Sequence, residues 1–325
     1  MTVVTAHAEQ HSRLAHFPIT FFATGMGMMG LTLAVRAEET AFGLAHDISV
    51  GLLALSSFLL ALVVLFYLAK AIRHPDHVAA EWHHPVRIAF FPAITISFLL
   101  MSTALIDVMP ALARQIWMVA TLAQGLLALA VIGSWISHRP FQPGQMTPAW
   151  FIPAVGNVIV PLVGAKLGYV EISWLFYSGG LIFWVVLLTL VMNRLMFHDP
   201  LPGRMVPTLM ILIAPPAVAF IAWTRLEGAP GPFGHFLLNT AYVFALLVLT
   251  QVGKFRTMPF AMSWWALSFP VAALSIASFT YAHIAQSTPH LVIGAGLLVL
   301  LIAIVTGLIL RTIAAIWAGT ICVPE

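Results

Sequence analysis

The chain has 325 residues, of which 61% are hydrophobic and only 8% are charged. Soluble globular domains usually carry about a quarter charged residues, so this composition excludes an ordinary soluble domain and indicates an integral membrane protein. The net charge is +3, an excess that membrane proteins place in cytoplasmic loops, so we do not expect nucleic-acid binding. The single cysteine, Cys322, excludes an intrachain disulfide.

Ten apolar segments follow one another along the chain. Each is close to the ~20 residues that a membrane-spanning helix needs, whereas barrel strands would be shorter and alternating. Short loops separate them, so we predict one all-α transmembrane domain over residues 1–325 without a soluble domain. The segments are 17–35, 48–69, 88–109, 112–135, 149–165, 170–193, 205–224, 233–252, 259–282 and 290–316.

The parts outside these segments are short. Residues 1–16 are polar and lack the order of a signal peptide, so we expect segment 17–35 to remain as a span. The longest connections, 74–85 and 137–148, are predicted to be polar or proline-rich turns. We see no long tail and expect no control by phosphorylation there.

The basic residues predict the orientation of the chain. The N-terminus, the loops after even-numbered spans and the C-terminal end carry ten of them, against four on the other side, so both termini should be cytoplasmic and the protein should lie in the inner (plasma) membrane. The ten are Arg13, Lys70, Arg73, Arg87, Arg139, Arg194, Arg204, Lys254, Arg256 and Arg311, and the four are Arg36, Arg114, Lys166 and Arg225.

Prolines distinguish the odd-numbered spans from the even-numbered ones. Spans two, four, six, eight and ten contain no proline, whereas seven prolines fall within or at the mouth of odd-numbered spans: Pro18, Pro92, Pro153, Pro161, Pro215, Pro216 and Pro270. Proline kinks a helix because it lacks an N–H group. We therefore predict a unit of one kinked and one straight helix, a helical hairpin used five times.

Broken backbone at membrane depth is tolerated where it lines a watery path or is buried in protein. We therefore predict that the kinked helices line a central pore and that the straight helices face lipid. Small and weakly polar residues follow the kinked spans at helical spacing, although close helix packing also selects small residues. The predicted pore-lining or hinge residues are Thr20, Thr24, Gly25, Pro92, Thr95, Pro153, Asn157, Pro215, Pro216, Ser268, Pro270 and Ser275.

The sequence offers little for enzymatic or metal chemistry. Asp47, Asp107, Lys166, Glu171 and Arg194 lie near predicted span ends and are expected to be solvated or snorkelling. The pairs His74/His77 and His7/His11 have ligand-like spacing, but no carboxylate or cysteine completes a site. The phosphate-loop pattern is absent. We predict no enzyme, no cofactor and no metal site.

The predicted path is neutral and apolar, which leaves its preferred ion open. Without a ring of Asp or Glu it serves cations poorly. Broken helices offer half-helix N-termini, whose partial positive charge favours anions, but a kink also frees carbonyl groups, which favour the opposite sign.

Four stretches resemble the tellurite-resistance/dicarboxylate transporter family, which includes bacterial TehA and the slow-type anion channels of plant guard cells. They are HHPVRIAFFPA (83–93), WFIPAVGN (150–157), NRLMFHDPLPGRMVPTLMILIAPPAVAF (193–220) and PFAMSWWALSFPVAALSIASFTYA (259–282). With ten suitably spaced spans, the likeness covers essentially the whole chain.

The resemblance implies ten helices in five hairpins, a pore in each protomer of a homotrimer, and a phenylalanine that plugs the pore in the ninth span. The family's motif maps onto Trp265, Ala266, Leu267, Ser268 and Phe269, so Phe269 takes the gate position. The chain departs from the pattern in two places. Leu267 replaces an aromatic residue, and Ala23 and Gly25 stand where a proline and a glycine are expected in span one.

The leading hypothesis is an anion channel gated by Phe269, in which small hydroxyls such as Ser268 and Thr24 replace part of the ion's hydration. Its weak selectivity should favour nitrate over chloride. The alternative is a secondary transporter of C4-dicarboxylate or of tellurite- or sulfite-type oxyanions, for which Arg87 is the nearest positive partner. A membrane enzyme or a subunit of a larger complex finds no support in His, Cys or acidic clusters.

Overall fold

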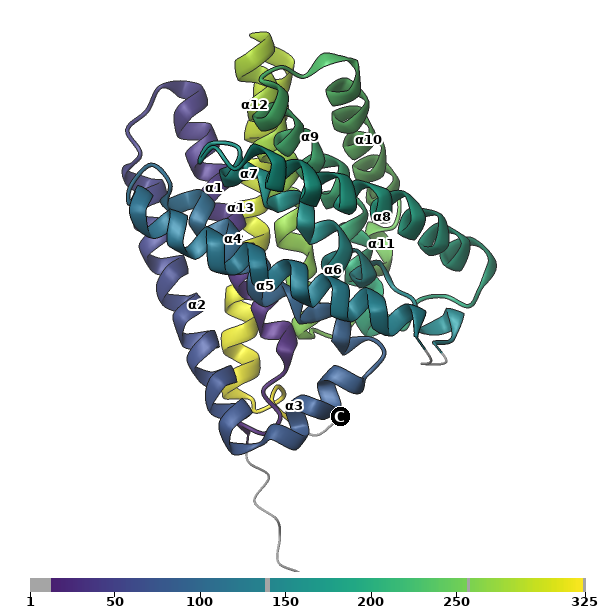
Figure 1. The fold of residues 1–325 in the computed structure, drawn as a ribbon. Helices are drawn as coiled ribbons and strands as arrows, with labels where there is room; N and C mark the ends of the chain where they lie inside the picture. The colour runs from purple at the N-terminus through teal and green to yellow at the C-terminus, as the bar shows by residue number, and fades with distance from the viewer. Residues whose placement is uncertain (1–12, 138–140, 256–257, 324–325) are drawn as a thin grey trace, which may run out of the picture.

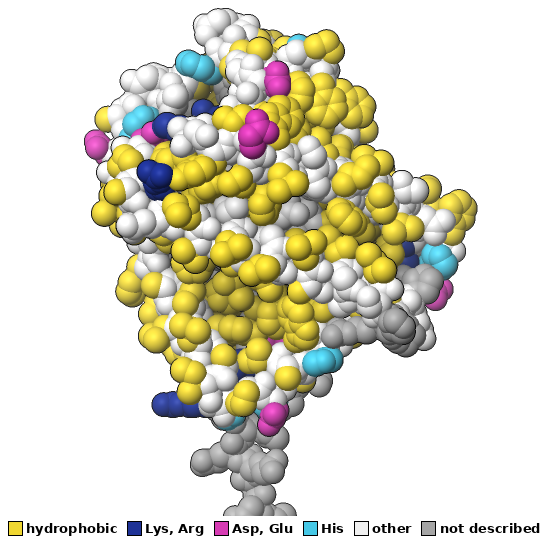
Figure 2. All heavy atoms as spheres, in the orientation of Figure 1, with side chains coloured by type: hydrophobic (Ala, Val, Ile, Leu, Met, Phe, Trp, Pro, Cys, Tyr) yellow, Lys and Arg dark blue, Asp and Glu magenta, His cyan; other side chains and the backbone are white. Residues whose placement is uncertain are grey.

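The computed structural model describes residues 13–137, 141–255 and 258–323, and all regular secondary structure among them is helical (Figure 1). Nine helical stretches are long and apolar enough to cross a membrane, and a tenth, Pro148–Gly164, is shorter. Hydrophobic side chains cover the middle of the molecule, whereas charged side chains gather toward its two ends (Figure 2). This distribution is that of a multi-pass membrane protein, as the sequence predicts.

The even-numbered spans are long, uninterrupted α-helices on the outside of the molecule. In the apolar part of each, 28–39% of the residues are buried, so most of their side chains face outward, where lipid would lie. They are α2 (Asp47–Arg73), α5 (Pro110–Ile136), α8 (Val170–Phe197), α10 (Gly231–Leu249) and α13 (Thr288–Trp317).

The odd-numbered spans are buried and interrupted. In the four long ones, 72–89% of the residues of the apolar window are buried. Each begins as a 3-10 helix (η) and continues as an α-helix. They are η1 (Ile19–Phe21) with α1 (Phe22–Phe42), η2 (Arg87–Phe90) with α4 (Pro92–Leu105), η6 (Gly203–Leu212) with α9 (Ala214–Glu227), and η7 (Met262–Leu267) with α12 (Ser268–Ala285).

The fifth span is the most broken. It consists of η4 (Pro148–Trp150), α6 (Phe151–Val155), η5 (Gly156–Ile159) and α7 (Pro161–Gly164). Pro153 and Pro161 both lie in it, and Pro161 starts the last short helix. Pro148 starts the span, and the missing N–H groups of Pro153 and Pro161 further along prevent a continuous α-helix.

The prolines act at the start of α-helices. Pro92, Pro215 and Pro270 occupy the first three residues of α4, α9 and α12, where the backbone N–H groups have no intrahelical partner in any case. Pro270 therefore does not interrupt a continuous α-helix. The preceding 3-10 helix ends at Leu267, and Pro270 lies in the first turn of α12.

The five inner spans form a closed ring. In order, α1 packs against α4, α4 against α6 and η5, η5 and α7 against α9, α9 against α12, and α12 against α1. Each inner span also packs against the outer helix that follows it in the chain, for example α1 against α2 and α12 against α13. The inner and outer roles of the spans are confirmed, while the origin of the hairpins as a repeat stays a prediction.

Glycine allows α1 and α12 to approach closely. A Cβ atom on Gly27 would lie 2.2 Å from the Ser268 Oγ atom and 3.0 Å from a ring carbon of Trp265. A Cβ atom on Gly30 would lie 3.0 Å from the Cβ atom of Ala272. This contact closes the ring.

The connection 74–85 is not a turn, so that expectation is wrong. It contains α3 (Pro75–His83), which Pro75 starts. The buried Glu81 of α3 accepts hydrogen bonds from the Lys70 ammonium (2.8 Å), the Tyr67 hydroxyl (2.9 Å) and the backbone N–H of Ile19 (3.1 Å). A buried charge is stable only when it is paired in this way, so Glu81 fastens α3 and α2 to the start of the first inner span.

The other short helices are η3 (Pro143–Gln145) and α11 (Val252–Phe255).

Candidate functional site

Among the described residues, the inner spans line a small and a much larger cavity. The smaller has a volume of about 40 Å³, and the larger about 520 Å³. We call the residues around the smaller cavity the neck and those around the larger one the vestibule. Phe269 and Val218 line both cavities. They therefore stand at the boundary between the neck and the vestibule.

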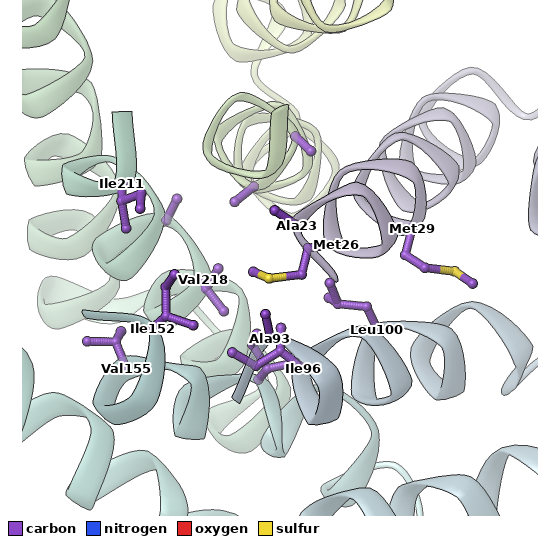
Figure 3. Close-up of a cluster of buried hydrophobic side chains, with 14 of the residues drawn as sticks. Ala23, Met26, Met29, Ala93, Ile96, Leu100, Ile152, Val155, Ile211 and Val218 are labelled. Carbon is purple, nitrogen blue, oxygen red and sulfur yellow. The ribbon is translucent and has the colours of Figure 1, made fainter. Parts of the chain in front are cut away.

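The neck is apolar all the way round. It draws residues from all five inner spans, and none of their side chains carries a polar group. The lining is Met26, Ile96, Phe151, Ile152, Val155, Gly156, Val158, Ile159, Ile211, Ala214, Pro215, Val218 and Phe269. Figure 3 shows Met26 pointing from α1 toward Ile152 and Val218, whereas Met29 on the same helix points away from them. A space of about 40 Å³ holds only a few water molecules, so the neck is closed to a hydrated ion.

Phe269 is held by the first turn of α12 and by α1. It directly precedes Pro270, and its side chain is only partly buried because it faces the cavities. A Cβ atom on Gly30 would lie 3.4 Å from the Phe269 Cδ2 atom. The phenyl ring therefore rests beside the backbone of α1 at a position where no side chain occupies the space.

The vestibule differs from the neck in charge. Arg36, Lys166 and Arg225 line it together with Asp107 and His283. The three cations lie near the C-terminal ends of α1, α7 and α9. With histidine neutral, three positive charges face one negative charge. The side chains of the vestibule therefore carry a net positive charge, a sign that attracts anions.

Asp107 is the counter-ion of this group. Its carboxylate accepts a hydrogen bond from the Lys166 ammonium and lies 3.5 Å from a guanidinium nitrogen of Arg36. Burial alone would raise the pKa of Asp107, but the hydrogen bond from Lys166 and the charges of Lys166, Arg36 and Arg225 outweigh it and lower that pKa below its usual value. Asp107 therefore stays ionised at neutral pH.

The predicted serine and threonine hydroxyls lie outside the two cavity linings. Ser268 and Ser275 are fully buried. The Ser268 hydroxyl donates to the Trp265 carbonyl (2.6 Å), and the Ser275 hydroxyl donates to the Gly294 carbonyl of α13 (2.9 Å). The Thr24 hydroxyl donates to the Phe21 carbonyl (2.7 Å), and Thr20 lies in η1. The structure thus places Ser268 and Ser275 in helix contacts.

Four of the predicted residues gather around one side chain that the sequence analysis missed. Gln124 of α5 is fully buried. Its amide nitrogen donates to the Pro153 carbonyl (3.2 Å) and to the Asn157 side-chain oxygen (3.1 Å). Its amide oxygen lies 2.6 Å from the Thr95 hydroxyl, which is also 2.9 Å from the Pro92 carbonyl. Gln124 therefore satisfies polar groups that the broken fifth span exposes.

The remaining predicted residues divide between the neck and helix contacts. Pro215 lines the neck, whereas Pro216 is buried outside the cavity linings. Gly25 lies within the continuous helix α1, and a Cβ atom on it would lie 3.0 Å from both the Leu60 side chain and the Ser97 hydroxyl. Gly25 therefore allows α1 to pack closely against α2 and α4.

The candidate carrier and metal residues also have definite places. Arg87 begins η2 and does not line either cavity. His74 and His77 pack edge to face, with ring centroids 5.9 Å apart. Within the described ranges, no three His, Cys, Asp or Glu side chains come together as metal ligands would. His7 and His11 lie outside the described residues.

The sequence analysis used Arg36 and Arg225 only to predict orientation. Yet three of the four basic residues assigned to the side opposite the termini, namely Arg36, Lys166 and Arg225, line one cavity. Their location at the ends of three proline-containing spans was the signal for the vestibule. The sequence did not distinguish Met26 as a neck residue, since many apolar residues of that span could have faced inward.

Comparison with known proteins identifies the family of this chain. Residues 16–313 match the family described as voltage-dependent anion channel. The S-type anion channel SLAH3 of Arabidopsis thaliana is 29% identical over 88% of this chain and 46% of its own length. The tellurite resistance protein TehA homolog of Haemophilus influenzae is 25% identical over 82% of this chain and 81% of its own. The chain thus spans about half the length of the plant relative.

Proposed function

Because the chain belongs to the voltage-dependent anion channel family, we propose that it is an anion channel with a central pathway that Phe269 closes. One observation carries the proposal: Phe269 lines both the neck and the vestibule. An ion that leaves the vestibule for the neck must pass this ring. The names of the relatives, which are S-type anion channels in Arabidopsis, support the same class of ion.

The pathway has the chemistry of a weakly selective anion pore. The net positive side chains of the vestibule attract anions, while the neck offers no charge and no hydroxyl to replace the hydration shell. Passage should therefore follow the ease of dehydration, and nitrate should pass better than chloride. An equal permeability to sodium and chloride would contradict this proposal.

We also propose how the protein lies in the membrane. The protein lies in the inner (plasma) membrane in this proposal. The ratio of basic residues supports a cytoplasmic location of both termini, which would open the vestibule to the outside. The resemblance supports a homotrimer in which each protomer has its own pathway. Cysteine labelling of the two ends and the mass of the purified particle test these two points.

The test of function is the anion current across a bilayer that contains the purified protein. We expect wild type to be nearly silent and Phe269→Ala to conduct, because the substitution removes the ring between the two cavities. Phe58→Ala is the matched control, since Phe58 is 61% exposed on the outer helix α2. If the Phe269→Ala protein is folded and inserted but conducts no current, the proposal that Phe269 closes the pathway is wrong.

A secondary transporter is the second candidate. Arg36, Lys166 and Arg225 in one cavity could bind a dicarboxylate or another oxyanion, which a carrier needs. Arg87, the sequence-based candidate, begins an inner span outside both cavities. Saturable uptake of a dicarboxylate without current, abolished by Arg225→Gln but not by Arg87→Ala, would favour a carrier that uses this cavity over the channel.

A further inference from the structure

The vestibule holds hydrogen-bonding capacity that the protein itself does not use. Arg225 and Thr280 both line it. Within the described part of the chain, neither the Arg225 guanidinium nor the Thr280 hydroxyl has a hydrogen-bond or ion-pair partner. The Arg225 side chain is exposed in the cavity. A guanidinium forms its strongest contacts with the oxygen atoms of anions.

The helix ends make the basic residues necessary. The inner helices α1, α4, α9 and α12 end at this side of the ring, and the C-terminal end of a helix carries about half a negative charge. Without cations the vestibule would repel anions. The side chains of Arg36, Lys166, Arg225 and Asp107 leave two net positive charges. These offset the four helix ends, which together carry about two negative charges, so an anion can reach the unused donors of Arg225 and Thr280 without repulsion from the helix ends.

The neck hinders the passage of the divalent anions that the vestibule attracts. The cost of removing an ion from water rises with the square of its charge, and the neck supplies no polar side chain in return. A monovalent anion is therefore far less hindered than a divalent one. The two cavities combine to retain a divalent anion on one side of Phe269.

We propose that the vestibule is a binding site for a divalent inorganic oxyanion of the sulfate class, held by Arg36, Lys166 and Arg225, and that this ion blocks the pathway. The blocking step rests on the proposed channel function, whereas the binding step does not. Asp107 competes with the bound oxyanion for Lys166 and Arg36, so it sets the affinity of the site.

Binding of radiolabelled sulfate to the purified protein in detergent tests the site without any current. We expect Arg225→Gln and Lys166→Gln each to weaken binding about tenfold, the loss of one charge-assisted contact. Asp107→Asn should strengthen binding, an effect that misfolding would not produce. Arg311→Gln is the control, because Arg311 is exposed on α13 near the chain's C-terminal end.

Equal binding of sulfate to wild type, Arg225→Gln and Lys166→Gln would overturn the proposal, as would weaker binding to Asp107→Asn. Chloride current through Phe269→Ala then tests the block. Sulfate added on the vestibule side should inhibit it, and sulfate on the other side should not. If the Phe269→Ala protein conducts no current but sulfate binds as expected, the proposed channel function is wrong and the proposed binding site is supported. If sulfate permeates, the blocking step is wrong.

Discussion

The neck and the vestibule share one ring of helices and yet have opposite chemistry. The neck is about 40 Å³ in volume and apolar, and the vestibule is about 520 Å³ and lined by side chains of net positive charge. The same inner spans build both. The neck lies where the prolines begin the α-helices, and the vestibule lies where these helices end. The difference indicates a division of labour, in which the vestibule selects the sign of the charge and the neck decides whether an ion passes.

The largest effect should come from the polar support behind the neck. Gln124→Leu removes the donor to the Asn157 side-chain oxygen and to the Pro153 carbonyl, and we expect a loss of about 1–3 kcal/mol of stability. Thermal unfolding in detergent measures this loss. In the Gln124→Leu protein, Thr95→Val should lower stability less than it does in wild type, because the Gln124 side chain that Thr95 contacts is already absent. Strict additivity of the two substitutions would show that the network does not support the fifth span.

The next effect should come from the neck itself. In a conducting Phe269→Ala protein, Met26→Ala should raise the single-channel conductance several-fold, because Met26 points into the space that an ion must cross (Figure 3). Met29→Ala is the matched control on the same helix. It removes a fully buried side chain and should lower stability without changing conductance. Equal conductance changes would place the constriction elsewhere.

A smaller, salt-dependent effect should come from the vestibule. Lys166→Gln with Arg225→Gln should lower anion current about threefold in dilute salt, because the local anion concentration falls. The effect should disappear in about 1 M salt, where charges act over only about 3 Å. Arg114→Gln is the control, since Arg114 donates to the Tyr169 hydroxyl (2.6 Å) and does not line the vestibule. A salt-independent loss of current would indicate altered structure.

The smallest effect should be the pH dependence of Asp107. Because its folded-state pKa is lowered, the ionised group stabilises the fold above its unfolded-state pKa, and this contribution is lost as pH falls through the folded-state pKa. Asp107 is 46% exposed, so the contribution should stay below about 1 kcal/mol. The difference in Tm between wild type and Asp107→Asn should be constant from about pH 8 to 5 and should vanish below about pH 3. A difference that changes near neutral pH would contradict this assignment.

The sequence predicted the architecture because proline and hydrophobicity act locally. Prolines restricted to alternate spans identified the inner helices. The high share of hydrophobic residues identified an integral membrane protein. The sequence did not show that Pro270 starts a helix, because the preceding 3-10 turn depends on packing. It also did not reveal α3, since the burial of Glu81 requires Lys70 and Tyr67 to be in place.

The candidate site was predictable only in part. The position of Phe269 in the pathway was predicted from the family motif. That of Pro215 was predicted from its place in an odd-numbered span. Ser268 and Ser275 were expected at the pathway, but helical periodicity cannot say whether a small residue faces a pore or a neighbouring helix. Gln124 was missed because it lies on a straight outer helix. The vestibule was missed because its cations are far apart in the chain and meet only when the ring forms.

The contact between α1 and α12 closes the ring, and these are the first and the last of its inner helices. During synthesis, therefore, the membrane receives four of the five inner spans before any enclosed pathway can exist. We expect ribosome-bound chains that end before residue 262 to be inserted yet unable to leak ions. The order of helices along the chain thus delays the hole in the membrane until the residue that closes it, Phe269, has already been made.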